Sequence, residues 1–138
     1  MKYLLGVDFG GSSSKATLLR EDGTVAATKS REYPTYYPQN GWAEQDPEDS
    51  YDAFVHNVRD LLAETNIDPE DIAAFALDAA THTAVLMDAA YKPVRRAIYW
   101  TDSRATAQAA RLKAGMGGDI MRECYNSVSS LWTLPQLM

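Results

Sequence analysis

The alternation of hydrophobic and polar positions predicts three short strands at the start of the chain. The apolar run Tyr3–Phe9 ends at two glycines, which is typical of a buried strand. The segment Lys15–Arg20 predicts a second strand, and an Asp-Gly turn within Glu21–Thr24 connects it to a third, Val25–Tyr33. Because both connections are short, we expect the three strands to form an antiparallel meander.

A loop rich in proline and aromatic residues is expected at Pro34–Gln45, and the residues after it have the spacing of a helix. Asp46 is a suitable N-cap for a helix, and Pro47 suits the first helical position. The apolar side chains beyond them recur every three or four residues and form one stripe, made of Tyr51, Phe54, Val55, Val58, Leu61 and Leu62. This spacing predicts an amphipathic helix whose opposite, charged face is solvated.

The remaining pattern predicts a fourth strand, a small hairpin and a second helix. The apolar segment Asp71–Ala80 predicts a buried strand, which the short connections of a β-α-β unit would place parallel to the first. Two more short strands are expected at Thr83–Asp88 and Arg96–Trp100. The segment Ser103–Gly115 has high helix propensity, and Gly115 is expected to stop the helix.

This order of elements predicts an α/β fold. Its sheet would be mixed, with an antiparallel three-strand meander followed by a β-α-β unit. The order differs from the regular alternation of strands and helices in a dinucleotide-binding sheet. It resembles the start of the ribonuclease H-like (actin-like ATPase) domain.

Composition and charge narrow the classes of function. The chain has 138 residues, with 46% hydrophobic and 23% charged residues, which suits one globular domain. The net charge of −6 argues against a nucleic-acid or anionic-membrane surface.

The first apolar run is too short for a signal peptide, and no stretch approaches the roughly 18 apolar residues of a membrane span, so we expect a cytoplasmic protein. Cys124 is the only cysteine, which excludes an intrachain disulfide, and we expect it to be buried.

The C-terminal sequence SVSSLWTLPQLM is apolar, whereas chain termini are usually polar. We therefore expect a chain that is truncated at its C-terminus, before the segment that would pack against it. An apolar surface left open in this way predicts dimerisation or aggregation.

The sequence DFGGSSSK, which begins at Asp8, carries the first candidate chemistry. Gly10 and Gly11 would allow positive φ and a close approach of the backbone to a ligand. The three serines Ser12–Ser14 add hydroxyl donors and Lys15 adds a positive charge, so the turn could bind an anion. Asp8 could meet a phosphate only through Mg²⁺, because both are negative. On this pattern alone, a Gly-Ser hairpin with a solvated lysine is the favoured explanation, because small Gly-Ser turns are common and the P-loop spacing is absent.

Three later segments add weight to the anion-binding interpretation. They are Trp42–Pro47, with the sequence WAEQDP; Ala80–Thr83, with ATHT; and Ile98–Arg104, with IYWTDSR. Together with Asp8–Lys15, they resemble four motifs of the FGGY family of carbohydrate kinases in the same order, closest in pattern to its xylulokinases. The motifs usually read Asp-x-Gly-Thr-Ser-x-x-Lys, Trp-x-Glu-Gln-Asp-Pro, Gln-Met-His-Gly and Ile-x-Trp-x-Asp-x-Arg. Each is weak alone, but together they cover nearly the whole chain.

The resemblance implies ATP-dependent phosphorylation of a sugar hydroxyl, with a pentulose such as xylulose as substrate and Mg²⁺ as cofactor. Residues 1–138 would be the N-terminal, sugar-binding half of a two-domain kinase whose C-terminal domain is missing. Asp8 would face Mg²⁺ and the transferred phosphoryl group. The phosphate would lie against Gly10, Gly11, Ser12, Ser13, Ser14 and Lys15. The general base and most adenosine contacts would lie outside the chain, so the chain alone should be inactive.

The same resemblance implies that Thr81, His82, Trp100 and Asp102 contact the sugar. For Asp102, a place in the wall of the site and an N-cap for the helix that begins near Ser103 are equally supported. Two departures from the family pattern matter: Gly11 replaces a threonine, and Thr81-His82-Thr83 replaces Met-His-Gly, which changes the sugar pocket. A non-catalytic sugar- or nucleotide-binding module of the actin-like superfamily, or a purely structural domain, remains an alternative.

Overall fold

The computed structural model describes all residues from Met1 to Met138. They form two compact units, each made of two segments of the chain. The sheet unit contains Met1–Pro34 and Pro47–Ala80, and the second unit contains Thr35–Asp46 and Thr81–Met138. No helix in either unit is both long enough and apolar enough to span a membrane.

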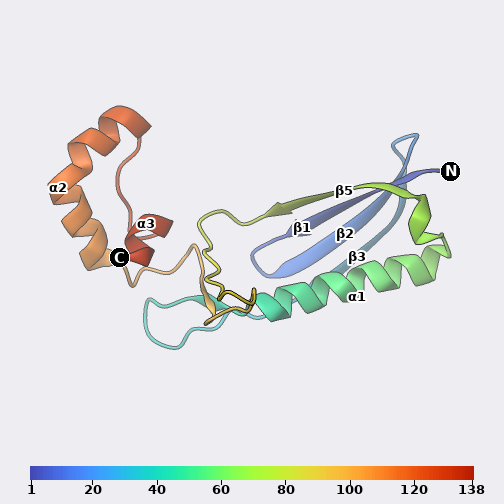
Figure 1. Ribbon diagram of the computed structural model, residues 1–138, viewed down its shortest axis with the longest axis horizontal. Coiled ribbons are helices and arrows are strands. Elements are labelled where there is room, and N and C mark those ends of the chain that lie inside the picture. The colour runs from blue at the N-terminus through green and yellow to red at the C-terminus, as the bar shows by residue number, and fades with distance from the viewer. The chain divides into compact units, whose positions relative to one another are not determined.

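The sheet unit is built on four strands in the order β3-β2-β1-β5 (Figure 1). The strands are β1 (Tyr3–Phe9), β2 (Ser13–Arg20), β3 (Val25–Glu32) and β5 (Ile72–Ala79). β1 is antiparallel to β2, β2 is antiparallel to β3, and β1 is parallel to β5. The predicted meander and the parallel fourth strand are therefore confirmed.

Helix α1 (Pro47–Thr65) packs on one face of this sheet, against β2 and β3. Alternate strand residues point at the helix and form the core with its Leu61: Leu5, Val7, Ala16, Leu18 and Ala27. The predicted apolar stripe is confirmed at Leu61, and Phe54 and Val58 pack against the core, but Tyr51 is exposed. The stripe also contains a buried polar residue, Asn57, whose side-chain amide donates to the carbonyl oxygen of Ser14 at 2.9 Å.

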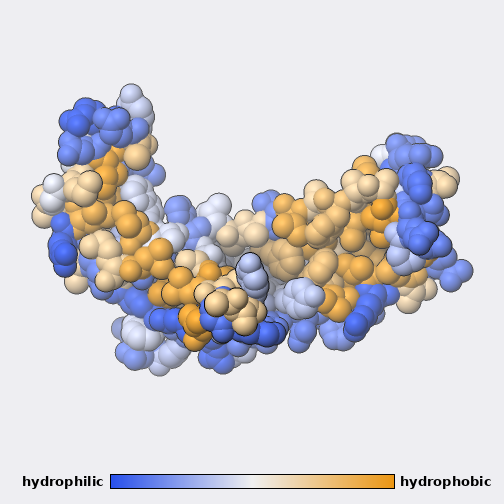
Figure 2. Space-filling view, viewed as in Figure 1, coloured by the Kyte–Doolittle hydropathy of each residue, from blue (hydrophilic) through white to orange (hydrophobic).

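Strand β5 differs from its prediction because its side chains are exposed. It lies at the edge of the sheet, where α1 reaches it through the ring contact of Phe54 with Phe75, and Phe75 and Leu77 are still 50% and 61% exposed. Figure 2 shows hydrophobic residues gathered on the visible surface of the sheet unit. A continuous apolar run predicts a strand suited to burial on both faces, but burial also needs covering elements, and α1 is too narrow to cover four strands.

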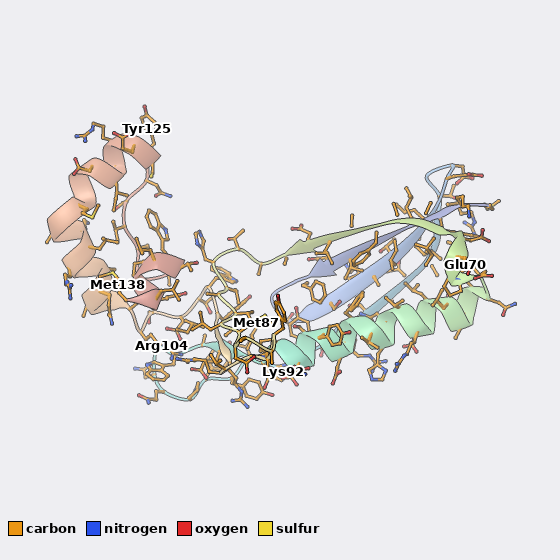
Figure 3. All side chains as sticks on the ribbon, viewed as in Figure 1. Glu70, Met87, Lys92, Arg104, Tyr125 and Met138 are labelled. Atoms are coloured by element: carbon orange, nitrogen blue, oxygen red, sulfur yellow. The ribbon has the colours of Figure 1, made fainter.

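The second unit has little regular β-structure. Strand β4 (Glu44–Gln45) lies in the predicted loop and pairs with β6 (Ala97–Ile98), which is shorter than the predicted strand Arg96–Trp100. The predicted strand Thr83–Asp88 is wrong, because the chain forms only isolated bridges there. The predicted hairpin turn is still present, closed by a hydrogen bond from the Asp88 N–H to the Lys92 carbonyl oxygen. Met87 and Lys92 are labelled beside it in Figure 3.

Helix α2 (Thr106–Cys124) continues beyond Gly115, where the sequence predicted a stop, and a short helix α3 (Thr133–Leu137) follows. An interior glycine costs a helix about 1 kcal/mol relative to alanine, which weakens the helix without ending it. The helix ends at Cys124, and the C-cap residue Tyr125 takes the left-handed conformation with φ of 53° (labelled in Figure 3). Cys124 in the last turn is exposed, so the expectation of a buried cysteine is wrong.

Candidate functional site

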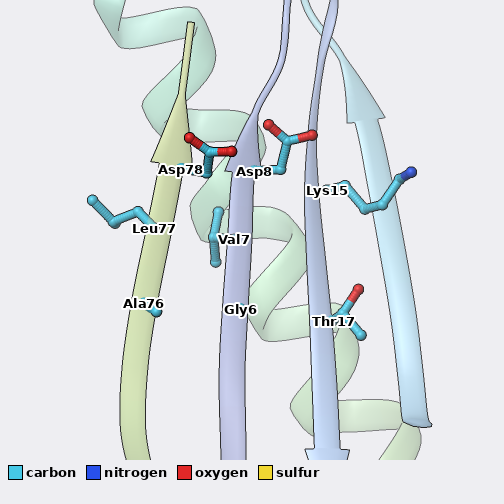
Figure 4. Close-up of a pocket in the computed structure, with 8 residues that line it drawn as sticks. All are labelled: Gly6, Val7, Asp8, Lys15, Thr17, Ala76, Leu77 and Asp78. Carbon is cyan, nitrogen blue, oxygen red and sulfur yellow. The ribbon is translucent and has the colours of Figure 1, made fainter.

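The candidate site of the sheet unit lies where the parallel strands β1 and β5 end. Asp8 of β1 is paired in register with Asp78 of β5 on one side and with Lys15 of β2 on the other. Residues directly opposite one another on neighbouring strands point to the same face, so these three form a row across the sheet (Figure 4). They border an open pocket of about 350 Å³, the Asp8 pocket, lined by Gly6, Val7, Asp8, Lys15, Thr17, Ala76, Leu77 and Asp78.

The turn after Asp8 is closed by a hydrogen bond from the Gly10 N–H to the Ser13 carbonyl oxygen at 2.9 Å. A Cβ atom at position 10 would lie 3.2 Å from that carbonyl oxygen and 3.8 and 4.0 Å from the two carboxylate oxygens of Asp8. The φ of Gly10 is not in the left-handed region, so the expectation of a positive φ is wrong for this glycine, while the expected close approach to a ligand stays a prediction. Gly10 suits this turn because a side chain there would press on the Ser13 carbonyl oxygen, whereas it would only touch the Asp8 carboxylate at ordinary van der Waals distance.

The three serines of the turn have different environments. Ser12 is exposed and Ser13 is half-buried, whereas Ser14 lies inside β2 on the face covered by α1. The Ser14 side chain is fully buried, and its hydroxyl has no hydrogen-bond partner. The prediction that Ser14 binds phosphate is therefore wrong for its side chain, because strand alternation turns it away from Lys15 and into the core.

Tyr33 supports the turn and was missed by the sequence reasoning. Its hydroxyl donates to the Gly10 carbonyl oxygen, and its backbone N–H donates to the Ser12 carbonyl oxygen at 3.0 Å. The side chain is buried directly after β3. A tyrosine at the end of a predicted strand gives no local signal of this role, because its two partners lie more than twenty residues earlier in the chain.

We expect alanine at Gly10 to destabilise the protein. The added Cβ would lie 3.2 Å from the Ser13 carbonyl oxygen, closer than an ordinary contact, so the turn would have to shift, which costs about 1–3 kcal/mol. Gly6, in the strand that leads into this turn, is the control, because a Cβ there meets nothing within 4 Å. Urea unfolding should show a lower free energy of unfolding for Gly10→Ala and an unchanged or higher one for Gly6→Ala. Equal effects of the two substitutions would contradict the steric explanation.

The other predicted site residues belong to the second unit. Thr81 and His82 are exposed, and His82 has a φ of 56° in the left-handed region. Trp100 is 43% exposed and packs edge-on against Tyr99, with 5.8 Å between the ring centroids. These exposed side chains are free to meet a ligand, and their contact with a sugar stays a prediction.

The Asp102 side chain is enclosed by other groups of the protein. It is fully buried, and its Oδ2 accepts the backbone N–H of Ala43 at 2.7 Å while Oδ1 accepts the backbone N–H of Arg104 at 2.8 Å. The Arg104 guanidinium binds both carboxylate oxygens. The N-cap alternative is wrong, because α2 has Ala105 at that position without a side-chain hydrogen bond. Both carboxylate oxygens are buried and already bound by protein groups. The prediction that Asp102 contacts the sugar directly is therefore wrong.

Arg104 joins Asp102 to a second buried acid (labelled in Figure 3). Its Nη2 lies 2.8 Å from Oε1 of Glu44, which also pairs with Arg95 at 2.6 Å. The guanidinium is stacked on the ring of Trp42, 3.6 Å from its centroid. The motifs WAEQDP and WTDSR thus meet in one network, which ties the segment before α1 to the turn that carries Trp100.

Hydrogen bonding sets the charge states of this network. Burial alone would raise the pKa of Asp102, but hydrogen bonds from the Arg104 side chain and from the N–H groups of Ala43 and Arg104 outweigh it and hold the pKa below its ordinary value of 3.8. Burial likewise opposes the charged form of Arg104, yet its bonds to Asp102 and Glu44 raise the Arg104 pKa. Both residues are therefore charged at neutral pH.

Acid should remove this stabilisation. Because the pKa of Asp102 is lower in the folded than in the unfolded state, its contribution is complete above the unfolded value near 3.8 and is lost as the pH falls toward the folded one. Urea unfolding between about pH 3 and pH 7 should show a weaker acid-dependent loss in Asp102→Asn than in the wild type. Parallel pH profiles of the two proteins would contradict this assignment.

Comparisons with known proteins agree with the resemblance seen in the sequence. The chain matches the model of the N-terminal domain of the FGGY family of carbohydrate kinases over residues 3–137. It is 32% identical to the xylulose kinase of Bacillus subtilis (strain 168) over 138 residues, which are 100% of this chain and 28% of that protein. It is 38% identical to the glycerol kinase of Bradyrhizobium sp. (strain BTAi1) over 115 residues, which are 83% of this chain and 23% of that protein.

Among solved structures, the chain resembles the crystal structure of a "xyloylose kinase" from Brucella ovis, with a TM-score of 0.91 and 30% sequence identity. That match covers 98% of this chain and 28% of the other. The fold is thus that of the actin-like ATPases, as the order of elements predicted. The chain spans about a quarter of the length of the curated relatives it matches.

Proposed function

This chain belongs to the FGGY family of carbohydrate kinases as an N-terminal domain, and we propose that the protein containing it transfers the γ-phosphoryl group of ATP to a hydroxyl of a sugar or polyol. The observation that carries the proposal is the end of β1, where the exposed carboxylate of Asp8 borders a pocket that Lys15 also lines. A pentulose such as xylulose is the proposed substrate, because the xylulose kinase relative aligns with all of this chain.

The family implies Mg²⁺ together with ATP, and the residues of the Asp8 pocket fit that ion. Asp8 offers an exposed carboxylate, which is the hard oxygen ligand that Mg²⁺ prefers. When bound, Mg²⁺ would neutralise charge on the transferred phosphoryl group. Asp8 would hold the ion, while Lys15 and the donor groups of Gly11, Ser12 and Ser13 would position phosphate oxygens. Gly10 drops out of this predicted set, because its N–H already donates to the Ser13 carbonyl oxygen.

Sugar binding is proposed for the exposed side chains of the second unit. The hydroxyl of Thr81 and the imidazole of His82 can exchange hydrogen bonds with sugar hydroxyls, and Trp100 offers an apolar ring face. Because Asp8 would be engaged with the metal, the carboxylate that accepts the proton of the attacking hydroxyl would come from outside these 138 residues.

The test compares this chain with the full-length protein in the presence of ATP, Mg²⁺ and a panel of ketopentoses and polyols. ADP production by the full-length protein with one of them supports the proposal, and the chain alone should produce little or none. Robust turnover by the chain alone would show that it contains the whole site. Sugar or nucleotide binding by the full-length protein without ADP production would favour a non-catalytic binding module instead.

A further inference from the structure

The Asp8 pocket contains a second carboxylate, Asp78, that neither the sequence motifs nor the proposed function uses. Asp8 and Asp78 are direct partners on neighbouring parallel strands, which lie about 4.8 Å apart, and both side chains are exposed. Figure 4 shows their carboxylates at the same end of the pocket, one beside the other. Asp78 accepts one hydrogen bond there, from the backbone N–H of Ala79 to Oδ1 at 2.8 Å, so its second oxygen stays available.

Two carboxylates in this position repel each other. Like charges directly opposite on neighbouring strands destabilise a sheet. None of the chain's ion pairs involves either aspartate. Lys15 is the register partner of Asp8, but its ammonium group points away from both carboxylates (Figure 4). The row therefore has two negative charges that the sheet unit itself does not compensate.

We infer that Asp78 is a second carboxylate of the divalent-cation site that Asp8 begins, an inference that rests on the proposed function for the identity of the ion as Mg²⁺. Ligand oxygens lie about 2.1 Å from Mg²⁺, so two of them on one ion are no more than about 4.2 Å apart. Carboxylates on strands about 4.8 Å apart can converge to that separation by rotating their side chains. Sites of this ion commonly use one or two carboxylates and leave the other positions to water and phosphate oxygens.

The experiment measures Mn²⁺ binding to the 138-residue chain by electron paramagnetic resonance, because Mn²⁺ is a paramagnetic substitute for Mg²⁺. The variants are Asp78→Asn, Asp8→Asn and the control Asp52→Asn, which makes the same change of charge at an exposed site on α1. Asparagine at position 78 can still accept the Ala79 N–H, so the fold should be preserved, which circular dichroism checks. We expect Asp78→Asn and Asp8→Asn each to weaken the Mn²⁺ affinity about tenfold or more, and the control to leave it unchanged.

A second readout needs no bound metal. With a chelator present, Asp78→Asn should raise the urea midpoint because it removes the repulsion from Asp8, whereas Asp52→Asn should not. Added Mg²⁺ should then raise the midpoint of the wild type more than that of Asp78→Asn.

The outcomes separate this inference from the proposed function. An Mn²⁺ affinity of Asp78→Asn within twofold of the wild type, or no saturable Mn²⁺ binding by the wild-type chain, overturns the inference. If that happens while the full-length protein phosphorylates a sugar, the proposed function stands and Asp78 is not a ligand. If both aspartates are needed for Mn²⁺ binding but the full-length protein transfers no phosphate, the cation site stands and the kinase proposal fails.

Discussion

Replacing Asp8 with asparagine should lower the kcat of the full-length protein by about 10²- to 10³-fold, the scale of losing one group that stabilises transition-state charge. The carboxylate lies at the carboxyl end of β1, where the turn at Gly10 leaves it accessible. Asparagine keeps the shape of the side chain but removes the negative charge that would hold Mg²⁺ at the transferred group. Steady-state ADP production at saturating ATP and sugar measures the effect.

The control for this substitution is Asp52→Asn on α1, which changes the net charge equally at a site remote from the turn in sequence and exposed to solvent. It should leave kcat unchanged. Raising the Mg²⁺ concentration should recover part of the activity of Asp8→Asn if the loss lies in metal binding. A kcat for Asp8→Asn within threefold of the wild type would contradict the assignment of Asp8.

Replacing Arg104 with alanine should destabilise the chain by about 3–5 kcal/mol, because it leaves a buried charge without its partner. Asp102 is 0% exposed and would keep only its two backbone hydrogen bonds, from Ala43 and from residue 104. Glu44 would keep Arg95 alone, and Trp42 would lose the guanidinium that covers its ring. Urea unfolding followed by tryptophan fluorescence measures the loss, since Trp42 reports on this part of the chain.

Two comparisons separate the network from general effects of losing an arginine. Arg111→Ala changes an exposed arginine on α2 and should alter the free energy of unfolding little. Arg104→Lys keeps the charge but not the planar, two-pronged hydrogen bonding, so its loss should be intermediate. A change below about 1 kcal/mol for Arg104→Ala would mean that the network is worth no more than a surface ion pair.

The sequence predicted the elements of the sheet unit well, because their signals are local. Apolar alternation, an Asp-Gly turn and a capped amphipathic stripe each lie within a few residues of what they specify. The errors arose where the outcome depends on distant parts of the chain. Whether β5 is buried, for example, depends on which elements cover it. The error at Gly115 is different, because it concerns neighbouring residues: those directly after the glycine continue the helix to Cys124.

The candidate site divides in the same way. Asp8, Gly10 and Lys15 stand within one short motif, so the sequence could nominate them together. Asp78 joins them only through the register of β1 with β5, which no local pattern specifies. Asp102 and Arg104 could be recognised in the sequence as parts of a motif. Their burial, and their bonds to Ala43 and Glu44, could be learned only from the packed structure.

The parallel pairing of β1 with β5 also has a consequence for the order of folding. The β1–β2 and β2–β3 hairpins close short loops, whereas the β1–β5 ladder brings Tyr3 to Ile72, across the two other strands and α1. Closing the longer loop costs more chain entropy, so this ladder should form late. Asp8 and Lys15 would therefore come together early, and Asp78 would reach them only when the sheet is complete. Binding of a divalent cation would then report the last step of folding, which helical circular dichroism does not detect.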